Sequence, residues 1–100
     1  LKSPHIDPVS LIPRYCAELK LDINIEKEAI KVLTNFINST SICGKDPKGL
    51  CAGAVYLVAK LKNQKISQKD ISRVIGVTEV TLRSRYKEFL QHISFNFNTN

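Results

Sequence analysis

The sequence predicts an all-α fold of five helices, with a central apolar third helix and a helix-turn-helix at its C-terminal end. Apolar residues recur at spacings of three and four, whereas the alternation typical of strands persists nowhere. Residues 50–59 are almost all apolar, which is typical of a helix buried on every side. Cap residues mark two closely spaced helix starts near residues 67 and 78. At 100 residues, the chain is expected to form one domain over 1–100.

The first two predicted helices carry amphipathic stripes. The first is expected from about Asp7 to Leu21, with Pro8 in the first helical position, which proline tolerates. Pro13 leaves two alternatives, because either the regular helix begins near Ser10 or the helix kinks. The second helix is expected from residue 24 or 25 to about residue 39. The stripe residues are Ile12, Tyr15, Cys16 and Leu19 in the first helix and Ala29, Ile30, Leu33, Phe36 and Ile37 in the second.

The third predicted helix begins with a strong start signal. Asp46 can cap it, and Pro47 suits its first position. Its apolar residues at 50–59 include many small ones, which let neighbouring helices approach closely. Gly53 lowers helix propensity by about 1 kcal/mol relative to alanine, so we expect a close backbone contact at this position.

Residues 66–93 predict the helix-turn-helix. Ser67 is expected to cap the fourth helix, and Gly76 is expected to end it in the left-handed conformation. Val77 should pack against the core and so anchor the turn, and Thr78 should cap the fifth helix. The segment 94–100 is expected to be a strand-like or loose end.

The predicted fifth helix carries an unusual outer face. Its expected buried stripe consists of Leu82, Tyr86, Phe89, Leu90 and Ile93. The opposite face is expected to present Val80, Ser84, Lys87 and Gln91, with Arg83 beside them. An ordinary solvated face would be mostly Glu and Lys, whereas this one combines an apolar side chain, small hydroxyls and cations.

That mixture suits a helix that enters the major groove of DNA. Arginine can bind guanine through two hydrogen bonds, valine can contact a thymine methyl, and lysine can neutralise a phosphate. Taken singly, an exposed valine such as Val80 or an arginine such as Arg83 is more often an ordinary surface residue. Arg85 lies nearer the buried stripe, so it could clamp a phosphate or pair with Glu88 or Glu79.

The net charge of +6 is unevenly distributed. Residues 1–59 carry seven Lys and Arg against six Asp and Glu, whereas residues 60–100 carry eight against three. The asymmetry favours an anionic partner such as nucleic acid, the alternative being a charge that serves only solubility.

Several classes of protein are disfavoured. The three cysteines, Cys16, Cys43 and Cys51, lack the spacing of a zinc site or a disulfide framework, and a reducing, intracellular location fits them. His5 and His92 have no evident partner and are expected at the surface. No catalytic cluster, phosphate loop or apolar run of 18 residues occurs, so we expect no enzyme activity, small-molecule substrate or membrane span.

Three stretches together resemble one known family. They are 13–21 (PRYCAELKL), 44–59 (GKDPKGLCAGAVYLVA) and 68–88 (QKDISRVIGVTEVTLRSRYKE). The third is the most specific. From about Asp7 to Ile93 the chain resembles the second cyclin-like repeat of transcription factor B, the archaeal counterpart of eukaryotic TFIIB. The resemblance implies a five-helix cyclin-like fold in a general transcription initiation factor.

The resemblance also implies partners and site residues. The family binds the TATA-binding protein on promoter DNA and recruits RNA polymerase, and its second repeat binds an element just upstream of the TATA box. Its base-contacting positions fall on Val80 and Arg83 of this chain. The neighbours implied for phosphate or further base contacts are Thr81, Ser84, Arg85 and Lys87. The loop 44–47 resembles the family's phosphate-facing turn, which implies that Lys45 and Lys48 contact the DNA backbone.

The chain departs from the family in two respects. Cys51–Ala54 stands where the family usually has an alanine run, which should alter packing rather than recognition. The zinc ribbon, the polymerase-reaching linker and the first repeat are missing, and the chain has no Met, so we expect a fragment of a longer protein. No cofactor is expected in this fragment, since zinc would belong to the ribbon. No residue is assigned to the TATA-binding protein.

Two other functions stay open at this point. Cyclin folds often bind proteins, so the basic face could meet an acidic partner. A sequence-specific helix-turn-helix regulator that acts without the TATA-binding protein is also compatible with the sequence. The expected location is the archaeal cytoplasm at the nucleoid, or the nucleus in a eukaryote.

Overall fold

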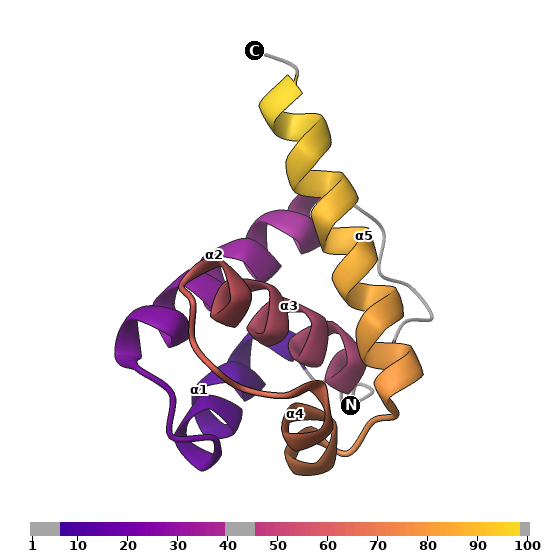
Figure 1. The fold of residues 1–100 in the computed structure, drawn as a ribbon. Helices are drawn as coiled ribbons and strands as arrows, with labels where there is room; N and C mark the ends of the chain where they lie inside the picture. The colour runs from indigo at the N-terminus through magenta and orange to yellow at the C-terminus, as the bar shows by residue number, and fades with distance from the viewer. Residues whose placement is uncertain (1–6, 40–45, 99–100) are drawn as a thin grey trace, which may run out of the picture.

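Five helices make up the structure, a computed structural model that describes residues 7–39 and 46–98. In chain order they are α1 (Pro8–Glu18), α2 (Ile23–Ser39), α3 (Pro47–Leu61), α4 (Gln68–Ile75) and α5 (Glu79–Asn98). Helix α3 lies in the middle, with α1 and α2 on one side, α5 on the other and α4 below (Figure 1). No strand occurs within these two described segments. The predicted all-α, five-helix fold is therefore confirmed.

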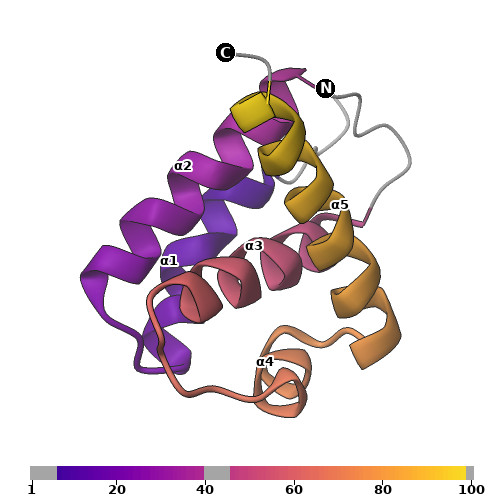
Figure 2. The same cartoon turned by 45° about the horizontal axis from the view of Figure 1, so that its top comes forward.

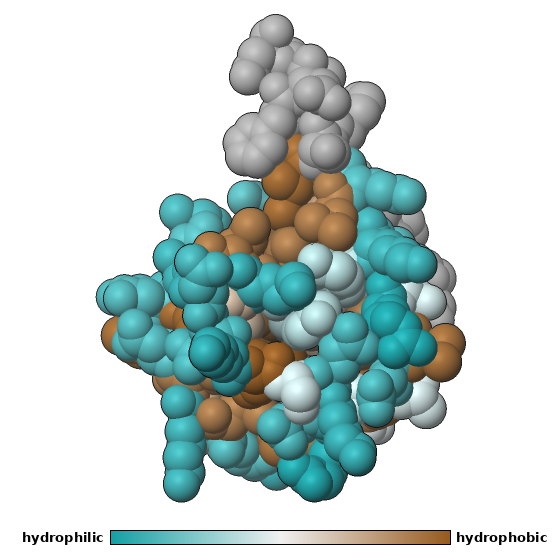
Figure 3. Space-filling model, in the orientation of Figure 1, coloured by the Kyte–Doolittle hydropathy of each residue, from teal (hydrophilic) through white to brown (hydrophobic). Residues whose placement is uncertain are grey.

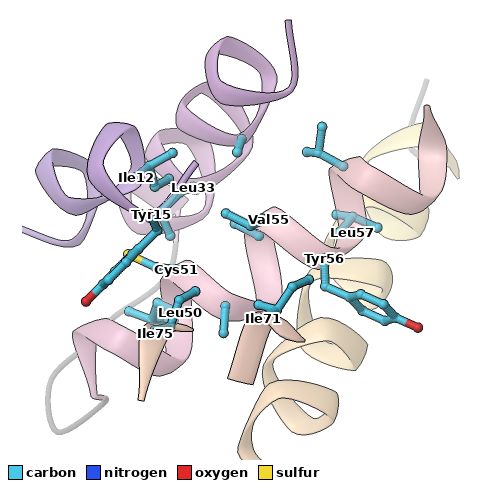
Figure 4. Packing of buried hydrophobic residues seen from close by; sticks show 14 of the residues in the cluster. Ile12, Tyr15, Leu33, Leu50, Cys51, Val55, Tyr56, Leu57, Ile71 and Ile75 are labelled. Atoms are coloured by element: carbon cyan, nitrogen blue, oxygen red, sulfur yellow. The ribbon is translucent and has the colours of Figure 1, made fainter. Parts of the chain in front are cut away.

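Helix α3 is central because almost its whole surface is apolar. Every residue from Gly49 to Ala59 is buried, and α3 packs against each of the other four helices. Figure 4 shows buried side chains of several helices gathered around α3 into one core. A helix that is apolar all round gains most when neighbours cover every side, so this segment organises the domain as the sequence predicts.

The helix ends follow capping chemistry. Asp7 and Asp46 cap α1 and α3, and each accepts a backbone N–H at 3.1 Å ahead of a proline-led first turn. Ser67 Oγ accepts the N–H of Asp70 at 3.0 Å at the start of α4. Gly76 ends α4 with φ of 91°, a left-handed conformation that glycine adopts without strain. These predicted caps are confirmed.

Replacing Ser67 with alanine is expected to destabilise the domain by about 1 kcal/mol, because α4 loses the acceptor for one of its free N–H groups. Urea unfolding followed by circular dichroism measures this change. Ser84→Ala is the matched control, since Ser84 is exposed in the interior of α5, where alanine is a good helix former. Equal losses in both variants would contradict the capping role.

Helix α1 begins as predicted but ends earlier than predicted. Asp7 caps the helix with Pro8 in its first position, so Pro13 lies inside α1 rather than in a first turn that begins near Ser10. The helix stops at Glu18 instead of Leu21, because Lys20 adopts φ of 58° and turns the chain out of the helix. Helix α2 starts at Ile23, one residue earlier than the earlier of its two predicted starts.

Three expectations for the last helix are wrong. Helix α5 continues to Asn98 and extends past the other helices (Figure 1), because the segment 94–98 contains neither glycine nor proline to stop it. Leu90 is 40% exposed; it lies about 100° around the helix from buried Phe89. His92 is half-buried, with its ring 5.4 Å from that of Phe36 and its Nε2 3.3 Å from Ser39 Oγ. His5 lies outside the described residues.

Two cysteines belong to the core. Cys16 and Cys51 are almost fully buried, as predicted. Burial raises the pKa of Cys16 to about 11 and that of Cys51 to about 12. The thiolate is the reactive form of cysteine, so these side chains act as small apolar residues. Cys43 lies outside the described residues.

Candidate nucleic-acid interface

A tight turn joins α4 to α5. The carbonyl oxygen of Ser72 accepts the N–H groups of Gly76 at 2.8 Å and Val77 at 3.1 Å. Val77 packs against the core, as predicted. Thr78 Oγ1 then accepts the N–H of Thr81 at 3.1 Å and caps α5. The result is two short, well-defined helix ends that hold the start of α5 beside α4 (Figure 2).

Helix α5 is anchored by one face. Leu82 and Phe89 are fully buried. The ring centroid of Phe89 lies 4.5 Å from that of Phe36 in α2, and Tyr86 lies 4.8 Å from Tyr56 in α3. Such aromatic pairs add orientation to the area that they bury. The opposite face of α5 is therefore fixed in its direction.

That opposite face is open to solvent, as predicted. Val80 is 65% exposed, although it is a large apolar side chain. Arg83, Ser84, Lys87 and Gln91 are also exposed. Figure 3 shows hydrophilic surface along the first turns of α5 and apolar surface towards its C-terminal end. The first turns thus present a methyl-bearing side chain among polar and cationic ones.

Arg83 has a defined position in the free protein. Its Nη1 donates to Gln68 Oε1 of α4 at 2.9 Å and lies 3.9 Å from Glu79 Oε1. Gln68 Nε2 in turn donates to the hydroxyl of Tyr56 in α3 at 3.1 Å. The Nζ of Lys60 lies 5.6 Å from the centre of the Tyr56 ring. Sequence reasoning missed Gln68, since nothing in its local pattern indicates a partner fifteen residues away.

Arg85 and Thr81 are partly buried, whereas the other predicted site residues on α5 are exposed. Of the two alternatives for Arg85, the structure shows the ion pair, with Nη1 2.6 Å from Glu88 Oε2. Thr81 is half-buried, and its methyl group would lie 3.0 Å from a Cβ placed on Gly49. Both side chains thus help to pack α5 against its surroundings as well as flanking the exposed face.

Further exposed cations lie on α3 and on the segment between α3 and α4. Lys48 is exposed in the first turn of α3, and Lys45 lies outside the described residues. The segment that leads into α4 adds a group of exposed lysines that share no ion pair with any described residue. They are Lys60, Lys62, Lys65 and Lys69. The charge asymmetry of the sequence indicated this group, but no motif assigned its members individually.

The His, Cys, Asp and Glu residues in the described part of the chain form no group of three or more that could hold a metal ion. Within the same residues, every helix is too short or too polar to cross a membrane.

The chain is similar to a family of transcription factors. Residues 1–92 match the family model described as the transcription factor TFIIB repeat. A transcription initiation factor IIB of Caldivirga maquilingensis is 42% identical over 94 residues, which is 94% of this chain and 28% of that protein. One of Pyrodictium occultum is 38% identical over 94% of this chain and 30% of that protein. Transcription initiation factor IIB 4 of Halobacterium salinarum is 40% identical over 84% of this chain. The chain thus spans less than a third of the length of these relatives.

Proposed function

Because the chain belongs to the TFIIB family of transcription initiation factors, we propose that it binds promoter DNA just upstream of a TATA box through α4 and α5. It acts with the TATA-binding protein to recruit RNA polymerase. The observation that carries this proposal is the outer face of α5, where Val80 and Arg83 stand exposed on a helix whose other face is locked into the core.

The chemistry of this face fits the major groove. The groove admits an α-helix, and its base edges distinguish every base pair. Arg83 is assigned to guanine, whose N7 and O6 accept two parallel hydrogen bonds, and Val80 is assigned to a thymine methyl. Arg83 is available for this role, because its pair with Glu79 is long, at 3.9 Å, and half-exposed. Exposed pairs of this kind contribute little and break readily.

Phosphate contacts flank the base contacts. Lys87 and Ser84 are exposed on the same helix and are assigned to the DNA backbone. Thr81 and Arg85 lie at the edge of this face, and they are assigned to backbone or further base contacts. Lys45 and Lys48 are assigned to phosphates near the start of α3. Such contacts set position and affinity but carry no sequence information themselves.

The other functions of the factor need more than this chain. The chain spans under a third of its relatives, so polymerase recruitment and the contact with the TATA-binding protein are proposed for the complete assembly. Any zinc would belong to a ribbon elsewhere in that assembly.

Titration of the chain, alone and with the TATA-binding protein, against promoter and scrambled duplexes at two salt concentrations tests the proposal. We expect the promoter to be preferred in the assembly and affinity to fall steeply with salt, because neutralised phosphates release counterions. Neither preference nor salt dependence would favour a protein-interaction module. Preference that is unaffected by the TATA-binding protein would favour an independent regulator.

Replacing Lys87 with alanine is expected to weaken binding to all duplexes alike, by about two- to fivefold, and to reduce the salt slope by about one. The reason is that a lysine on a phosphate contributes charge without reading sequence. Fluorescence anisotropy with a preferred and a scrambled duplex measures both quantities. A loss confined to the preferred duplex would show that Lys87 contacts a base instead.

A further inference from the structure

We propose that Gln68 is a positioning residue that sets the guanidinium of Arg83 for base recognition. This inference rests on the proposed DNA-binding function. Gln68 lies on α4 and would affect sequence specificity through the side chain of Arg83. The inference is based on the hydrogen-bonded bridge from Tyr56 through Gln68 to Arg83, which joins α3, α4 and α5.

The bridge fixes both ends of the Gln68 amide. Its Nε2 donates to the Tyr56 hydroxyl at 3.1 Å, and its Oε1 accepts from Arg83 Nη1 at 2.9 Å. Tyr56 is itself held in place, since it is 8% exposed and its ring packs 4.8 Å from that of Tyr86. The orientation of the glutamine is thereby set by the core. A single acceptor, aimed from a rigid anchor, then restrains a long and otherwise mobile arginine.

The atoms that Gln68 uses leave the recognition edge of Arg83 free. Both Gln68 and Glu79 approach the same nitrogen, Nη1. The Nε and Nη2 groups of Arg83 make no hydrogen bond to any residue of the described segments. These two nitrogens carry parallel N–H donors along one edge of the planar group. A guanine needs two such donors for its N7 and O6 atoms, so restraint through Nη1 is compatible with base binding through the other edge.

Preorganisation is the physical gain. An arginine that must be ordered on binding costs affinity, whereas one ordered in the free protein has already lost that freedom. The benefit is confined to the base pair that Arg83 contacts, because a misplaced guanidinium can still attract phosphates on any duplex. Gln68 should therefore change sequence preference more than general affinity, which a merely structural residue would not do.

The test uses selection from a library of random duplexes, followed by binding measurements on the winning element and on its variants at each base pair. In Gln68→Ala we expect the guanine preference at the Arg83-dependent base pair to fall by about three- to tenfold. Affinity for a scrambled duplex should change by less than about twofold. Gln64→Ala is the matched control, because Gln64 is an exposed glutamine four residues earlier with no side-chain hydrogen bond to a described residue. It should leave the preference intact.

Two further variants sharpen the result. In a background of Arg83→Ala, Gln68→Ala should cause no additional loss, since a positioning residue has nothing left to position. Gln68→Glu retains the acceptor oxygen, so it should keep the ratio between the guanine and variant duplexes, although its charge lowers affinity for both. Melting temperatures of all variants establish that each is folded.

The outcomes separate the two proposals. If Arg83→Ala removes the preference and Gln68→Ala retains it, or if the two losses simply add, the positioning role is wrong and the proposed function stands. If the wild-type chain selects no sequence at all, with or without the TATA-binding protein, both proposals are overturned. A loss in Gln64→Ala equal to that in Gln68→Ala also overturns the positioning role.

Discussion

Arg83→Ala is expected to lower affinity for the preferred duplex by about 1–3 kcal/mol and to leave affinity for unrelated duplexes nearly unchanged. The guanidinium supplies two directed hydrogen bonds to one guanine, and alanine supplies none. Arg83 is exposed in the first turns of α5, and its partners Gln68 and Glu79 are not buried, so the change leaves no buried polar group without a hydrogen bond. Competition binding in the presence of the TATA-binding protein measures the ratio between the two duplexes.

The matched control is Arg14→Ala. Arg14 lies on α1, has a side chain that is 73% exposed, and pairs with Glu18 at 3.5 Å, so it loses the same charge away from the interface. The control should bind both duplexes almost as the wild type does. If Arg83→Ala weakened both duplexes equally, Arg83 would be a phosphate contact. If it changed neither, the assignment of the base-contacting residue would be wrong.

Gly53→Ala is expected to destabilise the domain by about 1–3 kcal/mol, despite the higher helix propensity of alanine. A Cβ at this position would lie 2.7 Å from Arg85 Cβ, 3.0 Å from the Arg85 carbonyl carbon and 3.0 Å from Tyr86 N. Two of these atoms belong to the backbone of α5, so relief requires the whole helix to move away from α3. Urea denaturation measures the loss, and weaker discrimination between duplexes should accompany it.

Gly49→Ala makes the same change one turn earlier and serves as the control. Its Cβ would meet Thr81 Cγ2 at 3.0 Å and Arg85 Cγ at 3.6 Å, both side-chain atoms that can shift. Its effect should stay within about 1 kcal/mol of zero, since gained helix propensity offsets the crowding. Equal destabilisation by the two variants would mean that the close approach of α3 and α5 at Gly53 has no special importance.

Local rules made most of the fold predictable from sequence. The caps at Asp46, Ser67 and Thr78 depend on side chains within three residues of the groups that they satisfy. The burial of α3 follows from its composition alone. The exposure of Val80 and Arg83 follows from periodicity, once the buried side of α5 is identified.

The remaining features depend on tertiary geometry. The link between Gln68 and Arg83 joins two helices across a turn, and no sequence spacing encodes it. The burial of His92 against Phe36 depends on how α2 meets α5. The extension of α5 beyond Ile93 was missed because its polar and aromatic residues lack a clear stripe, although none of them breaks a helix.

The central claim is that the outer face of α5 enters the major groove and that Arg83 binds a guanine there. Substituting 7-deazaguanine, which lacks the N7 acceptor, at each guanine of the preferred element tests this most directly. We predict that one position weakens binding of the wild-type chain in its assembly with the TATA-binding protein, and that Arg83→Ala is insensitive at that same position. Binding that no substitution weakens, or an equal effect in Arg83→Ala, would contradict the claim.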